Sequence, residues 1–148
     1  MVNEYDDIGS LNEEGLALAK KDGKFGFIDQ TGKEIIPLVY DEVGSFNEQG
    51  LALAKKDGKS GFIDQTGKEI IPLIYDDIGS FNQQGLALVK KNGKSGVIDL
   101  MGEEVIPLIY DRVWDFNKQG LALIKKNGKS GFIDTTGKEI IPPIYDRV

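Results

Sequence analysis

The stretch KKDGKSGFIDQTGKEIIP, residues 55–72, decides the fold because it places two turn signals between apolar runs. An Asp-Gly pair between such runs predicts a two-residue β-hairpin, since both turn residues must tolerate positive φ. The second turn, residues 64–68, suits a three-residue loop closed by Gly67 in the left-handed conformation. Together with LALAKK at 51–56, the stretch predicts a three-stranded antiparallel meander whose third strand ends at Pro72. The hairpin pairs in the four copies are Asp22-Gly23, Asp57-Gly58, Asn92-Gly93 and Asn127-Gly128.

The meander recurs along the whole chain with a period of 35 residues, and no insertion or deletion breaks the register. Self-similarity at a fixed period is the signature of a repeat architecture. The markers of the period are Tyr5, Tyr40, Tyr75, Tyr110 and Tyr145. We therefore expect four repeats, at 5–39, 40–74, 75–109 and 110–144, with YDRV at 145–148 as a cap or the start of a fifth repeat.

The hairpin register predicts that each sheet has two apolar faces. Counting back from the turns puts bulky side chains on one face and mostly small ones on the other. The bulky face holds Leu51, Leu53, Phe62 and Ile70, and the other holds Ala52, Ala54, Gly61, Ile63 and Ile71. A single sheet with two apolar faces is unstable in water, so each bulky face should cover the small face of the next copy. The link YDDIGSFNQQG, 75–85, is expected to form a short fourth strand or a turn.

These residues resemble a known family. GLALAKKDGKFGFIDQTGKEIIPLVYDEV, residues 15–43, is similar to the WG-repeat (KWG repeat) family of bacterial proteins in its turn, Ile-Asp, Ile-Pro and Tyr-Asp positions. The similarity runs through all four copies. The tryptophan that names the family is replaced by Phe25, Ser60, Ser95 and Ser130. The resemblance implies a β-rich module that occurs in arrays of variable copy number, mostly without a defined activity.

The fold prediction is therefore all-β: four tandem 35-residue, three-stranded antiparallel meanders stacked in an open, twisted repeat array. The alternative architecture is a closed toroid that resembles a β-propeller, which also stacks sheets with two buried faces. Near-identical ends should be adhesive, so head-to-tail self-association is expected unless MVNE and YDRV cap the array.

The Gly-Lys-Ser tripeptides at 58–60, 93–95 and 128–130 look at first like the end of a phosphate-binding loop. Such a loop needs a glycine five residues before the Gly-Lys pair and a helix after it. Leucine stands at that earlier position in each case (Leu53, Leu88 and Leu123), and a strand is expected to follow. The pattern favours a hairpin tip with a solvated lysine.

The sequence also offers no pattern that is typical of a catalytic site. The recurring carboxylates form the same arrangement in every copy, whereas a carboxylate pair needs different environments to divide acid and base roles. They are Asp29, Asp64, Asp99 and Asp134, with Glu34, Glu69, Glu104 and Glu139 across the ladder. Calcium-loop spacing is absent. The chain holds no histidine to activate Ser60, Ser95 or Ser130 and no cysteine to bind a metal. We expect no catalytic, cofactor or metal residues, and no enzyme.

Three features remain as binding candidates. The lysines at each hairpin tip, Lys20, Lys21 and Lys24 with their equivalents, form either a solvated edge or a basic stripe for an anionic polymer. Trp114 stands where other copies have glycine, and it either packs on a neighbouring copy or stacks on a sugar ring. Leu100-Met101 replaces Gln-Thr, which indicates drift or a local apolar contact.

Charge and composition limit the partners. The net charge of −6 disfavours nucleic acid. The N-terminal stretch lacks the basic start and apolar run of a signal peptide, and no window reaches the roughly 20 apolar residues of a membrane span, so we expect a soluble chain without membrane insertion. The predicted function is a non-catalytic structural or protein-interaction repeat module, and the alternative is a carbohydrate-binding module that uses exposed aromatic residues. The sequence assigns neither ligand-binding residues nor a compartment.

Overall fold

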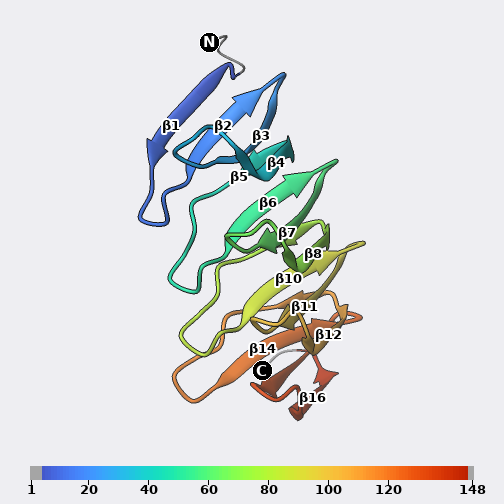
Figure 1. Ribbon diagram of the computed structural model, residues 1–148. Helices are drawn as coiled ribbons and strands as arrows, with labels where there is room; N and C mark the ends of the chain where they lie inside the picture. Colours follow the sequence, from blue (N-terminus) through green and yellow to red (C-terminus); the bar gives the residue numbers. More distant parts are fainter. Residues whose placement is uncertain (1–4, 147–148) are drawn as a thin grey trace. The chain divides into compact units, whose positions relative to one another are not determined.

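The computed structural model describes residues 5–146, and the protein there is built from β-strands and turns only. The chain divides into two compact units, Met1–Ile74 (unit 1) and Tyr75–Val148 (unit 2). The strands form four antiparallel four-stranded sheets, and each sheet is a meander in chain order, as Figure 1 shows. No helix in the described part of the chain is long and apolar enough to cross a membrane. The prediction of an all-β tandem-repeat fold is confirmed.

The two sheets of unit 1 are alike. The first consists of β1 (Asp7–Leu11), β2 (Ala17–Lys21), β3 (Lys24–Ile28) and β4 (Glu34–Tyr40). The second consists of β5 (Glu42–Val43), β6 (Ala52–Lys56), β7 (Lys59–Ile63) and β8 (Glu69–Tyr75), whose last residue opens unit 2. The link between meanders therefore supplies a fourth strand, and in the second sheet that strand is only two residues long.

Unit 2 repeats the arrangement. Its first sheet consists of β9 (Asp77–Ile78), β10 (Ala87–Lys91), β11 (Lys94–Ile98) and β12 (Glu104–Tyr110). Its second consists of β13 (Arg112–Val113), β14 (Leu121–Lys126), β15 (Lys129–Asp134) and β16 (Glu139–Tyr145). Of the segment predicted to cap the array or begin a fifth repeat, Tyr145 and Asp146 are described; the last two residues, like MVNE at the start, lie outside the described residues.

Both turn predictions are confirmed. Asp57 and Gly58 have φ values of 53° and 79°, as a two-residue hairpin with two left-handed residues requires. The turn pairs Lys56 with Lys59. In the second turn the Asp64 amide donates to the Lys68 carbonyl oxygen (2.9 Å), and Gly67 has a φ of 90°. The other copies repeat this geometry.

The stacking of bulky on small faces is also confirmed within each unit. In unit 1, Leu16, Phe27, Ile36 and Tyr40 of the first sheet form one buried cluster with Ala52, Ala54 and Ile63 of the second. The last three are fully buried. Removing one large apolar side chain from water stabilises the fold by about 1.5 to 3 kcal/mol, so such clusters hold the sheets together. In unit 2 the corresponding cluster joins Leu86, Val97, Ile106 and Tyr110 to Val113, Ala122, Ile124 and Ile133.

The predicted register of the third strand is wrong by one residue. Simple counting places Ile70 on the bulky face and Ile71 on the small face, but Ile71 is fully buried and Ile70 only half-buried. The pairings of the first sheet give the reason. Ile28 pairs with Glu34 whereas Phe27 pairs with Ile36, so one extra residue bulges out of the third strand. A bulge of this kind moves every later side chain to the opposite face.

The sequence predicted that the third strand ends at its proline, and this prediction is wrong. Strand β4 runs through Pro37 to Tyr40. It is an edge strand, and a second irregularity between Phe27 and Phe25 spares the proline from a ladder hydrogen bond it could not donate. The backbone of this segment lies directly over Gly26, where a Cβ atom would meet the Ile36 carbonyl oxygen at 2.4 Å.

Candidate functional site

Each Gly-Lys-Ser tripeptide begins in a hairpin turn and continues into the following strand. Gly58 is the second turn residue, and Lys59 and Ser60 begin β7. Ser60 is only 1% exposed, inside the sheet, and no helix follows it. Ser95 and Ser130 are buried in the same way. These serines therefore lie away from solvent, and the lysines of the tripeptides lie at the hairpin tips.

Within each unit, the aspartate of one Tyr-Asp pair joins the first sheet to the second. Asp41 accepts hydrogen bonds from the Lys24 ammonium, in the preceding sheet, and from the backbone N–H of Asp57 (2.8 Å), in its own sheet. Both interactions, with the Lys24 side chain the stronger, lower the pKa of the Asp41 carboxyl below its usual value. Asp111 repeats the arrangement with Lys94 (2.6 Å) and the backbone N–H of Asn127 (2.7 Å), and its pKa is lowered for the same reasons. The tip lysines Lys24 and Lys94 are therefore paired with aspartates, which weakens the alternative of a basic stripe.

These aspartates predict loss of stability in acid. A carboxyl whose pKa is lower in the folded state stabilises the fold above its unfolded pKa, near 3.8 here, and that contribution disappears as pH falls through the folded pKa. We expect the thermal midpoint to be flat from neutral pH to about pH 5 and to fall below about pH 4. In Asp41→Asn/Asp111→Asn the midpoint at neutral pH should be lower and the fall in acid shallower. Asp77→Asn, which removes an exposed carboxylate of β9, is the control. An acid profile that the double substitution leaves unchanged would contradict the assignment.

The carboxylates considered as catalytic candidates have structural partners. Asp64 accepts hydrogen bonds from the Thr66 hydroxyl (2.6 Å) and from the backbone N–H of Thr66 and Lys68 (2.9 and 3.0 Å), which closes the second turn. The Thr66 hydroxyl, the largest influence, lowers the pKa of Asp64. Asp29 and Asp134 have the same partners, whereas in the third copy Met101 supplies only its backbone N–H to Asp99 (2.9 Å).

Two of the glutamates across the ladder, Glu69 and Glu139, lie where the two sheets of a unit meet. Glu139 accepts a hydrogen bond from the Tyr110 hydroxyl at 2.5 Å, from the neighbouring sheet of unit 2. Burial and this carboxylate raise the pKa of Tyr110. In unit 1, burial and then the charge of Glu69 raise the pKa of Tyr40. Within residues 5–146 no cluster of three or more acidic side chains could hold a metal ion.

Trp114 lies next to a charged neighbour. The guanidinium of Arg112 lies over its ring, 4.4 Å from the ring centroid, as in a cation–π contact. One face of the indole is therefore covered by the guanidinium. Leu100 is half-buried and its side chain lies beside Gly85, whereas Met101 is 74% exposed.

A hollow of about 700 Å³ lies between the two sheets of unit 1. Its floor is apolar and consists of Leu16, Leu18, Phe27, Val43 and Phe46. Phe46 follows β5, and its ring is tilted by 45° against that of Phe27, with 5.1 Å between the centroids. Leu18, Val43 and Phe46 are only half-buried, so the floor is accessible from solvent. We call this hollow the Phe46 groove.

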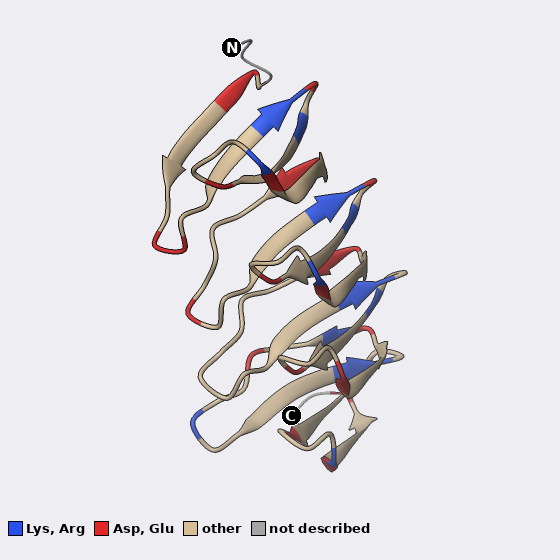
Figure 2. Cartoon of the chain, in the orientation of Figure 1, with Lys and Arg blue, Asp and Glu red and all other residues tan. Residues whose placement is uncertain are grey.

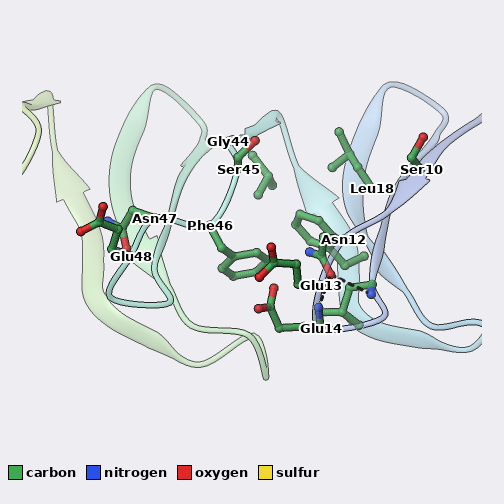
Figure 3. Close-up of a pocket in the computed structure, with 13 residues that line it drawn as sticks. Ser10, Asn12, Glu13, Glu14, Leu18, Gly44, Ser45, Phe46, Asn47 and Glu48 are labelled. Atoms are coloured by element: carbon green, nitrogen blue, oxygen red, sulfur yellow. Dashed lines mark hydrogen bonds between the residues drawn. The ribbon is translucent and has the colours of Figure 1, made fainter.

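The rim of the Phe46 groove is acidic and comes from the loop between β1 and β2. Figure 3 shows the carboxylates of Glu13 and Glu14 turned toward the ring of Phe46, whereas Glu48 points away from it. Asn12 fixes this loop, because its side-chain oxygen accepts hydrogen bonds from the backbone N–H of Glu14 (2.9 Å) and Leu16 (3.0 Å). The turn thus holds the backbone of the two glutamates beside the apolar floor.

The equivalent position in unit 2 has a different surface. The hollow there measures about 70 Å³ and is lined by Leu86, Leu88, Val97, Asp115 and Phe116 among others. Asn82 forms the same turn, with bonds of 2.9 and 3.0 Å to the N–H groups of Gln84 and Leu86. Glu13 and Glu14 are replaced there by Gln83 and Gln84. The turn is therefore conserved within the chain while its charge is not.

Charge also differs between the units as wholes. Residues 1–74 contain 14 acidic and 8 basic residues, whereas residues 75–148 contain ten of each, so unit 1 carries the entire net charge of −6. In Figure 2 the loop between β1 and β2 is red and the corresponding loop between β13 and β14, which contains Lys118, is blue. A net negative charge of this kind attracts cations over a distance, and salt weakens the attraction.

Glu13, Glu14 and Phe46 are absent from the candidates that the sequence suggested. Acidic residues in a turn are common in any soluble protein, and only the packing of two sheets places them beside an apolar floor. The signal that could have found them is variation inside a fixed Asn-x-x-Gly loop. Its variable pairs are Glu13-Glu14, Glu48-Gln49, Gln83-Gln84 and Lys118-Gln119.

Comparison with known proteins agrees with the repeat pattern. The family described as "WG containing repeat" matches residues 4–25, 25–59, 61–94, 96–129 and 131–148. Among curated proteins there is no match.

Two solved structures show a similarity of low identity. The structure titled "KlHsv2 with loop 6CD replaced by a Gly-Ser linker" is 11% identical, with a TM-score of 0.47 over 95% of this chain and 52% of that one. A protein of unknown function from Bacteroides caccae is 14% identical, with a TM-score of 0.32 over 90% of this chain and 58% of that one. The chain thus spans little more than half the length of either structure.

Proposed function

The chain belongs to the family of WG-containing repeats, and from that membership we propose that it is a non-catalytic repeat module that binds another protein. The Phe46 groove is the observation that carries this proposal. Protein interfaces are anchored by aromatic and aliphatic side chains that are packed in a pocket and surrounded by a polar rim. The groove has such a floor, and its volume of about 700 Å³ can receive more than one side chain of a partner.

The engagement of the titratable side chains supports a binding role over a catalytic one. Asp41 and Asp111 connect neighbouring sheets, and Asp29, Asp64 and Asp134 close turns. These carboxylates are held in their charged form by hydrogen bonds, which suits structural caps and not proton transfer near neutral pH.

Blocking the Phe46 groove is expected to abolish partner binding. Ser45 is exposed and lines the groove, so Ser45→Arg should place a long side chain across the floor without touching the core. Ser80→Arg is the matched control, because Ser80 is the exposed equivalent beside the small hollow of unit 2. Quantitative affinity capture from an extract of the source cells should recover the same proteins with wild type and Ser80→Arg, and roughly tenfold less with Ser45→Arg, a loss of about 1.4 kcal/mol.

Two results would count against the proposal. Equal capture by all three proteins would mean that the groove is not the contact surface. Recovery no greater than on a blank resin would mean that no such partner exists in the extract. Circular dichroism of both variants checks that the added arginine has not unfolded the sheets.

A further inference from the structure

We propose that the Phe46 groove recognises a basic segment of its partner, in which an aliphatic or aromatic side chain is flanked by lysine or arginine. This inference rests on the proposed function and names the chemistry of the partner. The apolar side chain would lie on the floor formed by Leu18, Phe27 and Phe46, and the flanking cations would lie beside Glu13 and Glu14.

The floor requires an apolar occupant. Phe27 and Phe46 present neighbouring rings, and Leu16 and Leu18 extend the apolar surface along β2 and the residue before it. Burying apolar area here stabilises the complex by about 25 cal/mol per Å² before the costs of association are subtracted. A purely polar or purely charged chain would leave this surface without a complementary contact.

The rim selects the charge of the occupant. Glu13 and Glu14 are adjacent, exposed and turned toward Phe46, and no ion pair within residues 5–146 involves either of them. Two like charges beside an apolar floor favour a cation and repel an anion. The charge of −6 on unit 1 acts in the same direction over a longer range.

Unit 2 provides an internal comparison. Its equivalent loop carries Gln83 and Gln84 in the same turn, its hollow is about 70 Å³ instead of about 700 Å³, and its net charge is zero. Of these two equivalent hollows, the one in unit 1 combines the larger volume with an apolar floor and an acidic rim, and unit 1 also carries the negative charge. This combination assigns the basic segment to unit 1.

The test uses the full chain and synthetic peptides as probes. The first probe is Gly-Lys-Lys-Leu-Phe-Lys-Lys-Gly, the second replaces Leu-Phe by Ser-Ser, and the third replaces each lysine by glutamate. Calorimetric titration measures the dissociation constants at low and at high salt, and amide chemical shifts locate the contact. We expect the first peptide to shift amides at residues 10–18 and 43–48, and the other two to bind at least about tenfold more weakly.

A pair of charge-matched variants separates the rim from general electrostatics. Glu13→Gln/Glu14→Gln copies the natural Gln83-Gln84 pair, so the turn should be retained. It is expected to raise the dissociation constant of the first peptide by about tenfold. Asp22→Asn/Glu34→Gln removes the same charge from exposed positions of unit 1 outside the groove, and should change that constant by less than about twofold.

Each contrary outcome overturns the inference. Equal weakening by both variants would mean that only the overall charge attracts the peptide. Equal affinity for the acidic peptide would show that the acidic rim does not select charge, and equal affinity for the serine peptide would show that the apolar floor does not contribute. Absence of binding by the first peptide would show that the partner segment is not basic. If the first peptide does not bind while Ser45→Arg still abolishes capture from the extract, the partner chemistry is wrong and the proposed function stands. If the peptide does not bind and Ser45→Arg does not reduce capture, both the partner chemistry and the proposed function are wrong.

Discussion

Gly61→Ala is expected to lower the free energy of unfolding by roughly 3 kcal/mol or more. An added Cβ would lie 2.4 Å from the Ile71 carbonyl oxygen and 2.7 Å from the carbonyl carbon of Pro72. Both are backbone atoms of strand β8, so the clash cannot be relieved by turning a side chain. Relief would require β8 to move away from β7, which would disturb the bulge that directs Ile71, fully buried, into the core. Urea denaturation followed by circular dichroism measures the loss.

Gly44→Ala is the matched control for this substitution. The nearest atoms to a Cβ at position 44 are 3.8 and 4.0 Å away, which is ordinary contact, and the fourth copy already carries Trp114 there. The expected change is within about 0.5 kcal/mol. If Gly61→Ala were as stable as Gly44→Ala, the strand could not lie over Gly61 as described.

Val97→Phe and Ile124→Ala are expected to be destabilising separately and to compensate each other when combined. Unit 1 has Phe27 and Ala54 at the equivalent positions of its buried cluster, and unit 2 has Val97 and Ile124. A phenylalanine at 97 would overfill the cluster, at a cost of about 1 to 3 kcal/mol. Alanine at 124 would leave a cavity, at a cost of about 2 to 5 kcal/mol. The double variant restores the large-plus-small combination that unit 1 uses.

A double-mutant cycle measures this compensation. We expect a favourable coupling free energy of at least about 1 kcal/mol between the two substitutions. Val97→Phe with Ile28→Val is the control, because Ile28 belongs to a separate buried cluster in unit 1, and that pair should be additive within about 0.5 kcal/mol. Additivity of the first pair as well would show that Val97 and Ile124 do not share one packing volume.

The hairpins of this protein could be predicted because particular turn residues specify them. Asp57-Gly58 and Gly67 each demand a backbone conformation that few other residues adopt, so they fixed the hairpins and their register before any packing was known. Alternation along β6 then indicated the stacking of a bulky face on a small face, which the buried clusters confirm.

The third strand could not be predicted in the same way. A bulge adds one residue without leaving a signature in apolar alternation, since Ile70 and Ile71 are both aliphatic. Only the close approach of the Ile71 carbonyl oxygen to Gly61 reveals why the strand shifts there and why a proline is accepted within it.

The candidate site could not be predicted from the sequence. The Phe46 groove combines the β1–β2 loop with Phe46, which follows a strand of the next sheet, and nothing in one copy alone indicates that they meet. The groups that sequence patterns favour, such as Asp64 and Ser60, are instead used to close turns or are buried.

The Asn-x-x-Gly loop separates what the fold needs from what a partner would see. In all four copies the asparagine makes the same pair of hydrogen bonds, and the two residues before the glycine carry a formal charge of −2, −1, 0 and +1 in chain order. Duplication of such a copy provides an already folded support whose two exposed positions can mutate without disturbing the core. An array of this kind can acquire new specificities one loop at a time, and the same two positions are where a combinatorial library would be placed to design new binders on it.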